Sequence, residues 1–74
     1  MPLTLNVLDA QNWTLDKTLK RLKTNCKNLT AGESFWLILQ EESQVCYDLL
    51  MQEGMLFQTF MSLGEGVKVH VSLP

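Results

Sequence analysis

Cysteine is scarce and long apolar runs are missing in this chain of 74 residues. The two cysteines allow at most one disulfide bridge, which excludes a small secreted domain held together by disulfides. No apolar run approaches the length of about 20 residues that a transmembrane helix needs, so we expect no membrane partner. The start of the chain lacks the basic segment of a signal peptide. These absences favour a cytoplasmic protein with reduced thiols.

The residue types that usually carry chemistry are equally sparse. A metal site needs three or four ligands at short spacings, whereas Cys26, Cys46 and His70 lie far apart in the sequence. Glu41 and Glu42 are adjacent acids before an expected helix, where the helix dipole explains them without an acid–base role. We therefore expect no catalytic residue, no metal and no cofactor. Enzymatic activity is left open, with a non-enzymatic protein favoured.

The clearest pattern is an amphipathic helix over residues 13–29. Thr14 or Asn12 can cap its start, and Trp13 is expected to cover that start. The helix should end before Gly32, which allows the chain to turn toward the next element. Spacings of four, three, four and three positions place the apolar residues on one face: Leu15, Leu19, Leu22, Cys26 and Leu29. The other face carries five of the six basic residues: Lys17, Lys20, Arg21, Lys23 and Lys27.

Charge is distributed unevenly along the chain. Residues 14–28 sum to +4, whereas the remainder of the chain sums to −6. Such asymmetry can steer an anionic partner toward the helix. The alternative interpretation is that the lysines only keep one helix face in solvent.

Strands and a second helix are predicted from the remaining apolar patterns. Alternation of Leu3, Leu5 and Val7 indicates a half-buried first strand, and the apolar run at 35–39 indicates a strand that is covered on both faces or paired centrally. Ser43 can cap a helix that ends at Gly54. The apolar stripe of that helix is expected to consist of Val45, Cys46, Leu49 and Leu50.

The last part of the chain predicts a hairpin. Residues 55–61 indicate a strand with a bulge or an edge position, 64–66 a turn, and 67–73 a strand with one wet face that includes His70. The order β-α-β-α-β-β predicts one α+β domain over residues 1–74, a two-layer sandwich. Two helices should pack on one face of a four-stranded mixed sheet, whose first two strands are parallel and joined by a right-handed crossover.

Two short segments match landmarks of a known family. Leu8-Asp9-Ala10 ends the first strand, and Ala31-Gly32-Glu33 precedes the second. With this element order, the chain resembles the TusA-like (SirA-like) sulfur carriers, which have Leu-Asp and Pro-Gly-Glu at these places. The family's functional motif Cys-Pro-x-Pro is absent, because the four positions are Leu15, Asp16, Lys17 and Thr18. The resemblance therefore implies the fold but not persulfide relay by the family's own thiolate.

We favour a non-catalytic protein-interaction or regulatory module. In this hypothesis the basic face of the first helix contacts an acidic protein surface. Trp36 is expected to lie with Ile38 on the sheet face away from the helices, where it would add an apolar contact.

Two alternatives stay open. Cys46 opens the second helix and could replace the missing carrier cysteine in a sulfur-transfer or thiol-dependent protein, although a core position is favoured for both cysteines. Nucleic-acid binding through the basic helix ranks third, because the chain is acidic overall and places no recognised stacking aromatics among its lysines. Self-association through an open sheet face is compatible with all three hypotheses.

Overall fold

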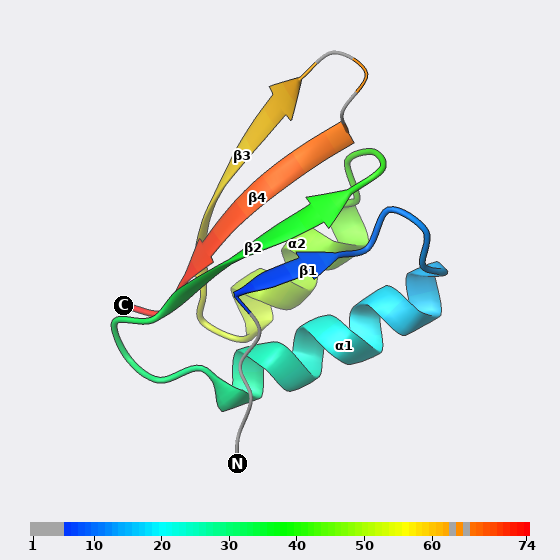
Figure 1. The fold of residues 1–74 in the computed structure, drawn as a ribbon. Coiled ribbons are helices and arrows are strands. Elements are labelled where there is room, and N and C mark those ends of the chain that lie inside the picture. The colour runs from blue at the N-terminus through cyan, green and yellow to red at the C-terminus, as the bar shows by residue number, and fades with distance from the viewer. Residues whose placement is uncertain (1–5, 63, 65) are drawn as a thin grey trace.

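The computed structural model describes residues 6–62, 64 and 66–74. The elements in chain order are β1 (Val7–Asp9), α1 (Leu15–Asn28), β2 (Ser34–Leu39), α2 (Gln44–Gln52), β3 (Leu56–Ser62) and β4 (Gly66–Ser72). The two helices form one layer and the sheet forms the other (Figure 1). The predicted β-α-β-α-β-β two-layer sandwich is thus confirmed.

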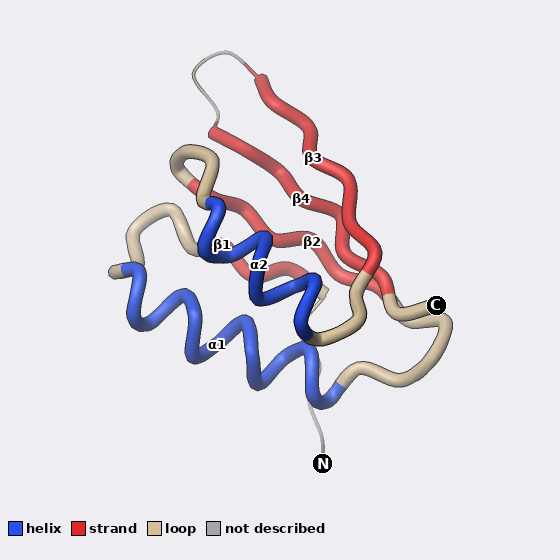
Figure 2. Tube along the Cα trace, turned by 180° about the vertical axis from the view of Figure 1, so that it is seen from behind, coloured by secondary structure: helices blue, strands red, loops and turns tan. Residues whose placement is uncertain are grey.

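The sheet has the strand order β1-β2-β4-β3. β1 pairs with β2 in parallel, while β4 runs antiparallel to both β2 and β3. The apolar run at 35–39 is therefore a central strand, as one of the two predictions had it. β3 lies at the edge of the sheet (Figure 2). Its pairing with β4 is unbroken from Leu56 to Ser62, so the edge prediction is confirmed and the bulge alternative is wrong.

The first helix begins where its cap was predicted. The backbone N–H of Lys17 donates a hydrogen bond to Oγ1 of Thr14 at 3.2 Å, which satisfies one of the free donors at the helix start. After the helix ends at Asn28, Gly32 adopts φ +88° and turns the chain into β2. Leu22 and Cys26 are buried as predicted, at 0% and 3% exposure.

One member of the predicted α1 stripe was placed wrongly. The side chain of Leu15, the first residue of α1, is 52% exposed. Thr18 and Asn25 are buried instead. The Thr18 hydroxyl donates a hydrogen bond to the carbonyl oxygen of Thr14 at 2.9 Å, so its burial does not cost an unsatisfied donor.

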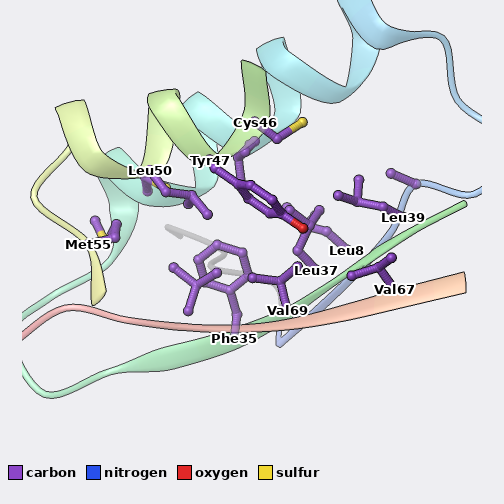
Figure 3. Close-up of a cluster of buried hydrophobic side chains, with 14 of the residues drawn as sticks. Leu8, Phe35, Leu37, Leu39, Cys46, Tyr47, Leu50, Met55, Val67 and Val69 are labelled. Atoms are coloured by element: carbon purple, nitrogen blue, oxygen red, sulfur yellow. The ribbon is translucent and has the colours of Figure 1, made fainter. Parts of the chain in front are cut away.

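The second helix also begins at its predicted cap but is rotated relative to the prediction. The backbone N–H of Cys46 donates to Oγ of Ser43 at 3.4 Å. Val45, expected in the core, is 48% exposed, whereas Tyr47 is buried. The cause is packing. Tyr47 projects toward the sheet (Figure 3), and its ring stacks on that of Phe57 of β3, with ring centroids 5.3 Å apart. A large aromatic pair thus decides which face of α2 turns inward.

At the end of the first strand, the residue that faces the core differs from the one predicted. Residues 1–5 lie outside the described residues, so Leu3 and Leu5 are not placed. Of the rest, Leu8 is buried and Val7 is 50% exposed. Parallel pairing sets this register: Leu8 lies beside Leu37 under the helices, and Val7 lies beside Trp36 on the other sheet face.

The core lies between the helices and one face of the sheet (Figure 3). Side chains alternate along the two central strands, so every second residue faces the helices. The inward residues from these strands are Phe35, Leu37, Leu39, Val67, Val69 and Val71. The alternation predicted for β4 is confirmed, with the valines buried and Lys68 exposed.

A pair of glycine substitutions tests the junction between β4 and β2. Gly66 and Gly54 have φ of +77° and +76°, so alanine is strained at both. An added Cβ at Gly66 would also meet the carbonyl oxygen of Leu39, whereas no described atom lies within 4 Å of one at Gly54. We expect Gly54→Ala to lower the free energy of unfolding by about 1 kcal/mol and Gly66→Ala by about 2–4 kcal/mol, measured by urea denaturation. Equal losses would contradict the close approach at Gly66.

Candidate protein-interaction surfaces

The basic side chains of α1 form an exposed surface, which we call the cationic face. It consists of Lys17, Lys20, Arg21, Lys23 and Lys27, all of them exposed. Nζ of Lys20 lies 3.4 Å from Oδ2 of Asp16 one turn earlier, but both side chains are about four-fifths exposed, at 78% and 81%. A pair so fully in solvent is weak. The cationic face therefore keeps most of its charge available to a partner.

A shallow groove borders the cationic face between α1 and α2. Lys20 and Lys23 lie on its α1 side, and Asp48 and Gln52 lie on its α2 side. Its apolar lining consists of Leu19, Val45 and Leu49. The exposure of Val45, which contradicted the predicted core stripe, thus places an apolar side chain beside two lysines. This arrangement suits a protein partner that offers acidic groups around an apolar contact.

The sheet face that bears no helix carries an aromatic cluster. Trp36 is 38% exposed on this open sheet face, on the side opposite Phe35 and Leu37, as predicted. Its ring centroid lies 4.7 Å from that of His70 and 5.7 Å from that of Phe60. His70 lies directly opposite Trp36 in the strand register. The histidine expected on the solvated face of the last strand is therefore partly buried beside the tryptophan ring.

The start of α1 holds no reactive thiol. Its first residue is Leu15, and an aliphatic side chain cannot form a thiolate. Trp13, Leu15 and Cys46 line one shallow hollow at this end of the molecule. Trp13 packs partly buried against the core there, with Nζ of Lys17 5.0 Å from its ring centroid. Cys46 thus lies near the start of α1, but its exposure is 0%.

Neither cysteine presents an accessible thiol. Cys26 is 3% exposed, and burial, with a smaller contribution from the negative charge of Glu53, raises the pKa of its thiol from 9.0 to about 11. The Cys26 thiol therefore stays protonated at neutral pH and is a poor nucleophile. Both cysteines occupy the core positions that were favoured.

Metal binding and membrane crossing find no support in the described part of the chain. No three His, Cys, Asp or Glu side chains among residues 6–62, 64 and 66–74 are grouped so that they could hold a metal ion. Neither described helix combines the length and apolar character that crossing a membrane requires.

No family model, curated protein or solved structure compared with this chain matches it. The resemblance to the TusA-like family accordingly rests on the two sequence landmarks and the order of the elements.

The raised pKa of Cys26 predicts a pH dependence of stability. Above pH 9 the unfolded chain loses the thiol proton while the folded chain keeps it, so stability is lost as the pH rises toward 11. We expect this group to remove about 1–2 kcal/mol from the free energy of unfolding over that range, a contribution that Cys26→Ala eliminates.

The free energy of unfolding is measured by urea denaturation at a series of pH values for the wild type and for Cys26→Ala. The difference between the two pH profiles isolates the contribution of Cys26. Burial also raises the pKa of the Tyr47 hydroxyl, and Tyr47 is common to both proteins. Parallel pH profiles for the wild type and Cys26→Ala would contradict the assignment.

Proposed function

We propose that this protein is a non-catalytic interaction module that docks on an acidic protein surface through the cationic face of α1. Its scaffold resembles that of the TusA-like sulfur carriers without the carrier cysteine. The observation that carries the proposal is the exposed cationic face beside an apolar groove, lined by Lys20, Lys23, Val45 and Leu49 among others. Charge supplies steering and orientation, and the apolar groove supplies buried area.

Nucleic acid is a weaker candidate for this surface. Single-stranded nucleic acid is bound by aromatic side chains that stack on bases between basic groups. Trp36 and Phe60 lie on the sheet layer, whereas the lysines lie on the helix layer. Trp13, beside the lysines, is partly buried against the core and lies near Lys17. The chain also carries a net charge of −2, which disfavours binding of a phosphate backbone to the surface outside α1.

Sulfur transfer through Cys46 is the second alternative. The observation in its favour is that Cys46 lines the same hollow as Leu15, and Leu15 is the residue that the resemblance aligns with the family's carrier cysteine. Against it, a carrier thiol must reach its sulfur donor, and Cys46 is fully buried. Docking by charge requires no rearrangement of the core and is therefore preferred.

Charge reversal tests the docking surface. A protein captured from lysate by the wild type is identified and purified, and its affinity is then measured for the wild type and for Lys20→Glu/Arg21→Glu/Lys23→Glu. We expect the triple variant to bind at least tenfold more weakly, a loss of about 1.4 kcal/mol or more, and wild-type binding to weaken with salt.

A matched pair of single variants controls for net charge. Lys23→Glu and Lys68→Glu change the net charge equally, but Lys68 lies on the open sheet face. Only Lys23→Glu should reduce the affinity. Equal affinities for the wild type and the triple variant would overturn the proposal, and a captured signal that nuclease removes would favour nucleic acid instead.

A further inference from the structure

β3 is an edge strand with an unusual composition. Its seven residues, LFQTFMS, include no charged residue and no proline. It is the last strand in the sheet order, and its pairing with β4 occupies only one of its two sides. Leu56, Phe60 and Met61 are 60%, 48% and 63% exposed. The strand is therefore long and largely apolar, and no other described strand pairs with its second side.

Edge strands of this kind are normally protected against pairing with another chain. The usual protections are a short strand, a charged residue, a proline, a bulge or a covering helix. β3 has no charge, no proline and no bulge. Tyr47 of α2 packs on Phe57, on the helix side of β3, and no helix runs along the free edge of the strand (Figures 1 and 2). Segments with this composition pair readily when their edge is exposed. The free side of β3 thus favours a partner strand.

The sequence of β3 is compatible with a second copy of itself. In an antiparallel pair centred on Thr59, Thr59 faces its own symmetry mate, and Phe57 faces Met61 of the other copy on the helix side. Phe60 faces Gln58 of the other copy on the open sheet face. The Phe57–Met61 pairs put apolar beside apolar, threonine faces threonine, and the ring of Phe60 can cover the stem of Gln58, with no like charges opposed. A slip that pairs residues from opposite faces would put the helices of the two copies on opposite sides of the sheet, so the alternation restricts the registers that keep all helices on one side.

We propose that two copies of this chain associate through antiparallel pairing of their β3 strands. The two four-stranded sheets then form one continuous sheet, with all helices on the same side. A second copy is the occupant that the sequence of β3 favours, because Phe57 and Met61 pair with each other and Thr59 with itself, whereas an uncharged strand offers nothing to select a charged peptide. α1 and β3 lie at opposite ends of the molecule, so the cationic face stays accessible in the dimer (Figures 1 and 2).

A lysine at the centre of the strand tests the interface. Thr59→Lys places two positive charges opposite each other at the dimer axis, whereas Thr24→Lys makes the same substitution on exposed α1. Mass is measured by sedimentation equilibrium from micromolar to millimolar concentration, with circular dichroism as the check on folding. We expect the wild type and Thr24→Lys to reach twice the monomer mass, and Thr59→Lys to have a dissociation constant at least tenfold higher.

A cysteine pair tests the register without adding charge. Opposed residues of antiparallel strands have Cα atoms about 4.5–5.5 Å apart, which is within the range that a disulfide spans. Thr59→Cys should therefore form a covalent dimer under mild oxidation much faster than Thr24→Cys, since the native cysteines are buried. A wild type that stays monomeric at millimolar concentration would overturn the proposal. So would equal association of the two lysine variants, or equal cross-linking of the two cysteine variants.

Discussion

The burial of one face of β2 beneath the helices is the constraint on which the rest of the structure depends. Phe35, Leu37 and Leu39 face inward at 1%, 0% and 5% exposure, while β1 and β4 pair on the two sides of the strand. Because side chains alternate along a strand, covering this face leaves Trp36 and Ile38 on the other. The single helical layer thus creates the core and the open sheet face together.

The same two-layer arrangement separates the outer surfaces by chemistry. The outward side of the helix layer carries basic side chains and the groove between α1 and α2, whereas the outward side of the sheet carries the cluster of Trp36, Phe60 and His70. The sheet ends at β3, with no charged residue in that strand. Steering by charge and association by strand pairing can therefore operate at different places on one small domain without competing for the same residues.

Local signals explain why most of the fold could be predicted from the sequence. Thr14 and Ser43 cap the helices as expected, and the alternating valines of β4 face the core. The errors arose where tertiary packing decides, because the rotation of a helix and the register of a strand depend on neighbours far away in sequence. The aromatic cluster comes from three strands, and no local pattern predicts it. The residues whose orientation was wrong are Val7, Leu15 and Val45.

The central claim is that this scaffold acts by docking and not through a thiol. The most direct measurement is the affinity of a cysteine-free chain, Cys26→Ala/Cys46→Ala, for the protein partner that the wild type retains, with folding verified by circular dichroism. Because both thiols are buried in the core, we expect the folded variant to bind with the wild-type affinity. Loss of binding by a folded cysteine-free chain would contradict the account and direct attention to Cys46 and its hollow at the start of α1.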